Sequence, residues 1–195
     1  MLGNKDGVSF DQLVADLYAA GTHGVSWRAP LRRLARLTRS QAVMLQRFSL
    51  LTSPASLLAS IDDGGLGPAE LEPYAARILK IGDPRAQFFL QHRSNRIWTD
   101  FDYTTERRMR HDPYYQEVLA PLDLKYAACA TLRVEPSTIT GWSLQRAPGA
   151  GPFHPSELQL FTRATFHART SLALLDARTA FRCDLSPSAI AVAGP

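Results

Sequence analysis

Few residues in this 195-residue sequence are spaced for nucleophilic, acid–base or metal chemistry. A metal site needs ligands at short fixed intervals, as in H-x-x-x-H or H-E-x-x-H on one helix face. Neither spacing occurs among the histidines, which are His23, His92, His111, His154 and His167. The sequence also lacks a G-x-S-x-G elbow, a P-loop and a dinucleotide fingerprint. We therefore expect a protein that is not an enzyme and that uses no metal or cofactor.

The two cysteines and His92 each allow one chemical alternative. Cys129 and Cys183 are far apart, the first in an apolar stretch and the second in a polar tail, so they form no disulfide framework. We interpret Cys129 as a small core residue with a reduced thiol. His92 could ligate a haem, although an exposed histidine on a polar face explains its surroundings, QHRSN, more simply.

Aromatic residues are better candidates for a binding function. They are dense from Phe88 to Tyr115, within a segment of residues 68–122 that is predicted to form short helices punctuated by prolines. A concave site lined by aromatic rings and a few polar groups is typical of small-molecule pockets. The candidate ligand-binding residues are Phe88, Phe89, Trp98, Tyr114, Tyr115, Tyr126, Trp142 and Arg146. The alternative is that these rings only cover one face of a sheet.

The elements that must position these residues begin with two helices. Apolar residues recur at helical spacing from Phe10 to Tyr18, with Ser9 as the N-cap and Gly21 as the stop. A second helix is predicted over residues 28–38. The helix and the residue just after it contain a cluster of five arginines, which are Arg28, Arg32, Arg33, Arg36 and Arg39.

The arginine-rich helix face has two interpretations. The net charge of +4 and the clustered arginines permit contact with nucleic-acid phosphates. Aromatic residues are not interleaved with the arginines, and no helix-turn-helix pattern is present. A solvated helix face is therefore the favoured interpretation.

Alternation of period two predicts four strands in two pairs. The first pair covers residues 41–50 and 57–61, and the second covers residues 126–134 and 139–146. The second pair is separated by a short turn and is typical of an antiparallel hairpin. A fold with two such pairs needs a long connection between them.

That connection, residues 68–122, is predicted to be a helical insertion. Asp83-Pro84 and Asp112-Pro113 each place a capping aspartate before a proline at the first helical position, so helices are expected to begin at both. Long connections in compact domains are often functional. We expect the insertion to cover a pocket.

A long last helix is predicted from Pro155 to about Ala177. It carries apolar residues at heptad spacing, and the candidate dimerisation residues are Phe161, Ala168, Leu172 and Leu175. Packing of this helix on the chain's own core explains the same spacing. A homodimer through this helix is therefore one of two interpretations.

The predicted fold class is α+β, an antiparallel sheet flanked by N- and C-terminal helices with a helical insertion between the second and third strands. No apolar stretch is long enough to cross a bilayer, and the N-terminus lacks a secretory apolar run. We expect a cytoplasmic protein with no membrane partner.

At the level of motifs, the sequence resembles the N-terminal GAF/PAS-like sensor region of LuxR-type helix-turn-helix regulators. The resemblance rests on a tyrosine upstream of an Asp-Pro pair, on a Tyr-x-x-x-Leu-x-Pro-x-x-Leu stretch, and on a Gly-Pro-Phe loop before a last helix that carries a histidine. The matching residues include Tyr115, Leu119, Pro121, Leu124, Gly151, Phe153 and His167. The closely spaced Trp/Tyr/Asp pocket motif of the acyl-homoserine-lactone-binding group is not identified.

The resemblance implies a small-molecule-sensing regulatory domain that acts on its output through the terminal helices. We expect the sensor domain over residues 1–178 and a flexible tail over residues 179–195. The DNA-binding output domain is absent from this chain, and we expect DNA to be contacted only through that domain. The alternative function is a ligand-free module for dimerisation or protein interaction.

Overall fold

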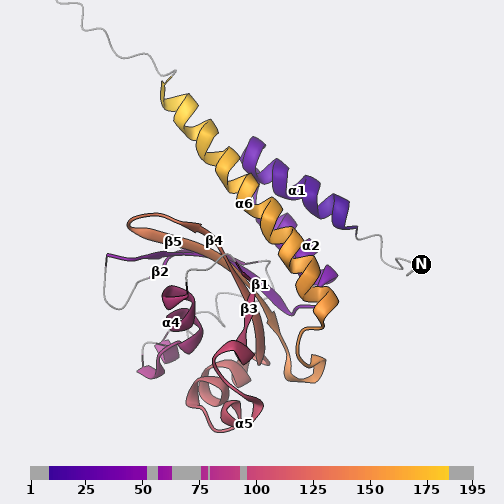
Figure 1. The fold of residues 1–195 in the computed structure, drawn as a ribbon, viewed down its shortest axis with the longest axis vertical. Helices are drawn as coiled ribbons and strands as arrows, with labels where there is room; N and C mark the ends of the chain where they lie inside the picture. The colour runs from indigo at the N-terminus through magenta and orange to yellow at the C-terminus, as the bar shows by residue number, and fades with distance from the viewer. Residues whose placement is uncertain (1–8, 52–56, 63–75, 79, 93–95, 185–195) are drawn as a thin grey trace, which may run out of the picture.

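The computed structural model describes residues 9–51, 57–62, 76–78, 80–92 and 96–184. Within these residues, three helices (α1, α2 and α6) lie on one face of an antiparallel sheet, and the short helices of the insertion lie on the other (Figure 1). The predicted α+β class is confirmed, with terminal helices flanking the sheet and a helical insertion in its middle connection.

The sheet has the strand order β2-β1-β5-β4-β3, and all neighbouring strands are antiparallel. The four predicted strands are confirmed to within one residue at each end, as β1 (Ala42–Ser49), β2 (Leu57–Asp62), β4 (Tyr126–Val134) and β5 (Thr138–Arg146). The edge strand β3 (Trp98–Thr99) is a two-residue addition inside the predicted insertion. It places Trp98 opposite Cys129 of β4.

Strand alternation gives each side of the sheet a different set of neighbours. In β5, the Trp142 ring packs against Phe161 of α6, with ring centroids 5.3 Å apart. Gly141, one position earlier, faces the opposite side and lies against the ring of Phe89. Adjacent residues of one strand therefore contact the terminal helices and the insertion.

Helix α1 (Phe10–His23) begins as predicted but ends later. The Ser9 hydroxyl accepts a hydrogen bond from the Gln12 backbone N–H at 3.1 Å, which confirms the N-cap. The predicted stop at Gly21 is wrong, because the helix continues to His23 and ends at Gly24, whose φ of 66° is left-handed. Glycine adopts that conformation without steric cost.

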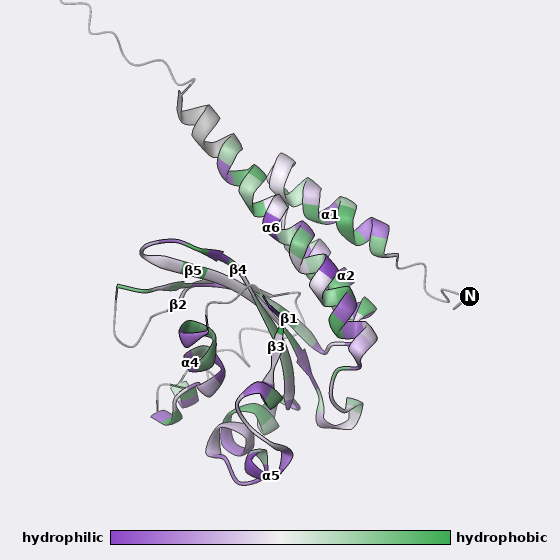
Figure 2. Cartoon of the chain, in the orientation of Figure 1, coloured by the Kyte–Doolittle hydropathy of each residue, from purple (hydrophilic) through white to green (hydrophobic). Residues whose placement is uncertain are grey.

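Gly21 instead permits a close helix crossing. It is buried where α1 packs against α6 (Pro155–Asp184), and a Cβ atom there would overlap the Ser171 carbonyl oxygen. The Ser171 hydroxyl donates a hydrogen bond to the Leu17 carbonyl across the same crossing. Figure 2 shows hydrophobic and hydrophilic residues interleaved along both helices, as expected of amphipathic helices that bury one side.

Helix α2 (Arg28–Leu37) confirms the second predicted helix, and part of its basic face is paired. Arg33 donates to Asp16 of α1 at 2.7 Å. Arg39, just beyond the helix, lies 3.3 Å from Glu157 at the start of α6. These pairs tie α2 to its neighbours, and contact with nucleic acid stays a prediction.

Both predicted Asp-Pro helix starts in the insertion are confirmed. Asp83 caps α4 (Pro84–Gln91) by accepting from the Ala86 backbone N–H at 3.0 Å. Asp112 accepts from the Tyr114 backbone N–H at 2.9 Å, where the π-helix η2 (Tyr114–Leu119) begins. The other short helices are η1 (Asp100–Asp102), α5 (Glu106–Met109), η3 (Ala120–Leu122) and η4 (Pro148–Ala150). Residues 68–75 of the predicted insertion lie outside the described residues.

The last helix, α6, corrects the assignment of Phe161 and Ala168 to a dimer interface. Phe161 and Ala168 are fully buried in the chain's own core, so neither has surface to offer a second copy. Leu172 packs against the same core, and Leu175 is partly buried. The heptad spacing is explained by packing within the chain, because α1 and the sheet cover this side of α6.

Helix α6 also continues beyond its predicted end near Ala177, to Asp184. Its C-terminal turns extend past α1 and away from the sheet (Figure 1). The predicted flexible tail falls mostly on residues 185–195, which lie outside the described residues. Among the described helices, none has the length and apolarity to cross a membrane.

Replacing Gly21 with alanine should destabilise the fold, because the added Cβ forces α1 away from the α6 backbone. We expect a loss of about 2 kcal/mol in the free energy of unfolding, typical of overpacking. Urea unfolding followed by circular dichroism measures this value. The matched control is Gly149→Ala, where a Cβ meets nothing within 4 Å. Equal stability of the two variants would contradict the close crossing.

Candidate ligand-binding site

A buried ion pair between Arg85 of α4 and Asp100 of η1 underlies the candidate site. The Arg85 Nε donates to Asp100 Oδ1 at 2.7 Å and its Nη2 donates to Oδ2 at 3.1 Å. The two side chains are 6% and 1% exposed. The remaining guanidinium donors reach Gln145 Oε1 at 2.9 Å and the Lys125 carbonyl at 2.5 Å. The guanidinium of this α4 residue is therefore held by η1, by β5 and by the residue just before β4.

The Asp100 carboxylate collects three further donors. The hydroxyls of Tyr103 and Tyr115 donate to it at 2.8 and 2.7 Å, and the Ala127 backbone N–H donates at 2.5 Å. Burial and the adjacent Asp100 carboxylate raise the pKa of both tyrosines well above the usual value. Both hydroxyls thus remain protonated donors at physiological pH.

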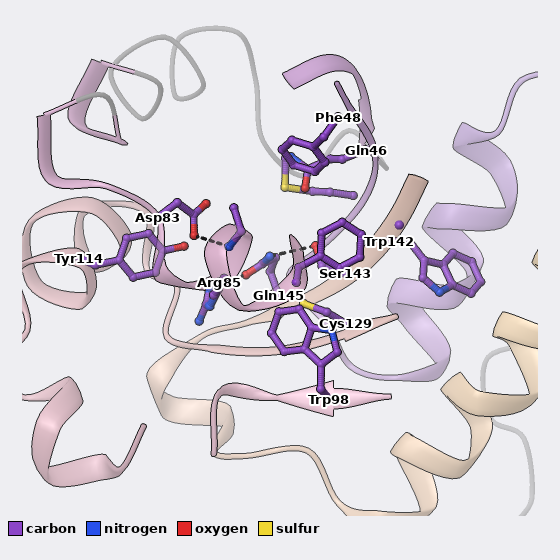
Figure 3. A pocket seen from close by; sticks show the side chains of 14 residues that line it. Gln46, Phe48, Asp83, Arg85, Trp98, Tyr114, Cys129, Trp142, Ser143 and Gln145 are labelled. Carbon is purple, nitrogen blue, oxygen red and sulfur yellow. Dashed lines mark hydrogen bonds between the residues drawn. The ribbon is translucent and has the colours of Figure 1, made fainter. Parts of the chain in front are cut away.

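A cavity of about 50 Å³ lies beside this ion pair, between α4 and the insertion-facing side of the sheet (Figure 3). Strands β1, β4 and β5 form its floor, and β3, α4 and η2 contribute its walls. The lining residues are Met44, Gln46, Phe48, Asp83, Arg85, Ala86, Phe89, Trp98, Tyr114, Cys129, Gly141, Trp142, Ser143 and Gln145. Apolar rings and polar groups therefore meet in one site.

Three polar groups contribute to the cavity's hydrogen-bonding character, from Asp83, Tyr114 and Trp98. Asp83 and Tyr114 point toward one another (Figure 3). Burial raises the pKa of Asp83, and the hydrogen bond from the Ala86 N–H offsets part of this rise. Trp98 is 2% exposed, and its indole Nε1 has no hydrogen-bond partner within the described part of the chain. A buried N–H without a partner favours binding of a ligand that carries a hydrogen-bond acceptor.

The thiol that lines the cavity is not activated. Cys129 is free and buried, as predicted, and burial raises the pKa of its thiol well above the usual value. The thiol is therefore protonated and a poor nucleophile. In the part of the chain that the structure describes, no group of three or more His, Cys, Asp or Glu residues could hold a metal ion.

Four of the predicted ligand-binding residues are gathered here or at the rim. Phe89, Trp98 and Tyr114 line the cavity. Phe88 packs edge-on against Trp98. It also stacks on His92, and the centroids of the Phe88 and His92 rings are 4.0 Å apart. The His92 ring is therefore positioned by this stacking and by a contact of 3.0 Å between its Nδ1 and the Phe88 carbonyl oxygen.

The other four predicted residues have different environments. Tyr115 belongs to the Asp100 network, and the Tyr126 hydroxyl donates to Glu106 at 2.5 Å. Trp142 borders the cavity, but its ring points toward α6 (Figure 3), where Nε1 donates to Thr165 at 3.1 Å.

Arg146 faces the helical layer and not the cavity, which corrects its assignment to the ligand site. Its Nη2 lies 2.8 Å from Glu157, and it donates to the Thr38 and Pro152 carbonyls. Its guanidinium also covers the Phe153 ring at 4.0 Å. Arg146 therefore fixes the start of α6, because strand alternation places it on the Trp142 side of β5.

Sequence reasoning missed several cavity residues. Asp83 was assigned only a capping role, and Arg85 was given none. In β5, Gly141 and the side chains of Ser143 and Gln145 share the cavity face by alternation. Because residues alternate along a strand, placing Trp142 on one face of β5 would have predicted that these three residues lie on the other.

Comparison with known proteins gives matches among solved structures. No protein-family model and no curated protein matches the chain. The ligand-binding domain of VqsR from Pseudomonas aeruginosa is 16% identical, with a TM-score of 0.60 over 90% of this chain and 99% of that one. CepR2 from Burkholderia cenocepacia, an N-acylhomoserine-lactone-dependent LuxR-family factor, is 16% identical, with a TM-score of 0.56 over 88% and 99%.

A phycoerythrobilin-bound GAF domain from a cyanobacterial phytochrome is also similar. It is 11% identical, with a TM-score of 0.51 over 89% of this chain and 99% of that one. The chain has a GAF-like fold. This agrees with the sequence resemblance to the sensor regions of LuxR-type regulators, and at such identities the GAF-like likeness shows the fold alone.

Asp100→Asn should strongly destabilise the protein, because it leaves the Arg85 guanidinium buried without a counter-charge. Breaking a buried pair from one side typically costs about 3–5 kcal/mol in the free energy of unfolding. The matched control is Asp176→Asn, which removes the partly exposed pair with Arg133 and should cost under about 1 kcal/mol. Chemical unfolding of both variants checks the difference, and a cost for Asp100→Asn as small as the control's would contradict the proposed weight of this pair.

Proposed function

We propose that this chain is a small-molecule-sensing regulatory domain of a bacterial transcriptional regulator. The observation that carries the proposal is the unpartnered Trp98 Nε1, which lines the same cavity as the half-buried Asp83. The GAF-like fold supports it, since solved structures with this fold include a domain described as ligand-binding and an N-acylhomoserine-lactone-dependent factor.

The cavity groups favour a neutral ligand with an amide-like pair of hydrogen-bonding groups. A carbonyl oxygen would accept from Trp98 Nε1, and an N–H or O–H would donate to Asp83. An apolar part would lie against Phe89, Phe48 and Met44, which line the same space. A carboxylate ligand is disfavoured, because it would bring a second negative group beside Asp83.

Ligand entry must repack the cavity. Its volume of about 50 Å³ is well below the ~300–1,000 Å³ of drug-sized sites. The Phe89 ring already fills the space where a Cβ of Gly141 would be, so a ligand has to displace this ring. Such a ligand would shift the protein between two states only if it binds them unequally.

The proposal assigns the chain no catalytic step and no cofactor. Regulation of transcription implies a cytoplasmic protein that contacts DNA through an output domain. The change at the pocket would be transmitted by the terminal helices, which cover the opposite face of the same sheet.

The small cavity also favours a second candidate, a ligand-free dimerisation module. In this case the outer face of α6 would meet a second copy. Phe166 is 66% exposed and Leu174 is 39% exposed, and both lie on the side of α6 that the chain's own core leaves uncovered. Thr170 and Ala173 continue the same face at heptad spacing from Phe166.

Native mass spectrometry of the purified chain, compared with its denatured mass, distinguishes the two candidates. We expect an added mass that disappears on denaturation. Trp98→Phe should weaken binding of that molecule about tenfold, the value of one lost hydrogen bond of roughly 1.4 kcal/mol. Trp27→Phe, a matched change in the buried core away from the cavity, should leave binding unchanged.

One result would count against the sensor proposal, and a second would count against the proposed binding site. An empty dimer would favour the dimerisation module. A retained ligand whose affinity is unaffected by Trp98→Phe would show that the molecule binds elsewhere on the chain.

A further inference from the structure

A second cavity, of about 130 Å³, lies between η1, the start of β4 and the loop that leads into α6. Its lining residues are Thr99, Asp100, Phe101, Tyr126, Ala127, Pro152, Phe153 and Leu158. None of these residues lines the first cavity. The two cavities are therefore separate sites, and an occupant of the second would touch the first turn of α6 directly.

The polar side chains that line this second cavity are already engaged. Asp100 accepts five hydrogen bonds from Arg85, Tyr103, Tyr115 and Ala127. The Tyr126 hydroxyl donates to Glu106, and the Thr99 hydroxyl donates to Asp102 at 3.4 Å. A polar ligand would gain little here, because its groups would lose their water without finding unpaired partners.

The rest of the lining is apolar and largely aromatic. The rings of Phe101 and Tyr126 are tilted toward each other, with centroids 6.2 Å apart. Phe153, Pro152 and Leu158 supply the α6 side of the wall. This composition selects for an apolar occupant.

Nearby charges argue against a charged occupant, because the Asp100 carboxylate in the lining disfavours an anion and two cations beside the aromatic rings disfavour another cation. The Arg146 guanidinium covers one face of Phe153 at 4.0 Å, and the Lys125 ammonium lies 5.0 Å from the Tyr126 ring centroid. Two of the aromatic rings thus already hold a cation. A cationic ligand would meet these like charges at close range.

The volume sets the size of the occupant. An engineered apolar cavity of about 150 Å³ in another protein binds benzene. We propose that this second cavity binds a neutral group the size of one aromatic ring or a short alkyl chain. Phe101, which is 45% exposed, forms its solvent-side wall. The site shares no lining residue with the proposed sensing cavity.

Benzene is the probe, titrated into the full chain and followed by methyl and amide NMR. We expect saturable shifts of the Leu158 methyl groups and the Ala127 amide. Leu158→Trp fills the cavity and should weaken benzene binding at least tenfold. Leu174→Trp, on an exposed turn of the same helix, is the matched control and should bind benzene like the unmodified chain.

A second pair of variants covers the case in which Leu158→Trp does not fold. Phe101→Ala removes the solvent-side wall and should weaken binding several-fold, whereas Phe166→Ala, at a position 66% exposed and off the cavity, should not. The proposal is overturned by three results. The first is that the Leu158 methyl groups show no saturable shift. The second is that shifts are confined to first-cavity residues such as Ala86 and Cys129. The third is that Phe101→Ala and Phe166→Ala bind benzene with equal affinity.

Discussion

The buried Arg85–Asp100 pair connects elements that are distant in the sequence. Through Arg85 it holds α4 to Gln145 of β5 and to the Lys125 carbonyl, and through Asp100 it holds η1 to Tyr115 and to the β4 backbone. A buried charge is tolerated only when it is paired and its remaining hydrogen-bonding capacity is used, and both conditions are met here. The insertion is therefore fastened to the sheet by directional polar contacts that fix one arrangement of α4, β3 and η2.

Much of the fold could be predicted because its signals are local. The capping of α1 by Ser9 and the start of α4 at Asp83 follow from residues within one turn of each other, and the β4–β5 hairpin follows from alternation. The end of α1 was mispredicted for the opposite reason. No local pattern around Gly21 distinguishes a helix stop from a helix crossing, and only the partner Ser171, 150 residues later, decides between them.

The site was predicted less well, because its geometry depends on which face each residue takes. Phe89, Trp98 and Tyr114 were identified by residue type, since aromatic rings are characteristic of pockets. Residue type failed for Arg146, whose position on β5 directs it to Glu157 and the start of α6. It also gave no sign of the Arg85–Asp100 pair, which forms only when α4 and η1 are brought together by the sheet.

Strand β5 is the element through which the two sides of the domain would communicate. Gly141 and Ser143 line the cavity, and Trp142 between them packs against Phe161 and donates to Thr165 of α6. Under the proposed function, a ligand that displaced Phe89 from Gly141 would act on the backbone that positions the Trp142 ring. Close-packed interiors transmit such displacements because they contain few voids to absorb them. The start of α6 is fixed separately, by the ion pair between Arg146 of β5 and Glu157. A shift of β5 would therefore reach α6 at two points along its length, at Glu157 through Arg146 and at Thr165 through Trp142.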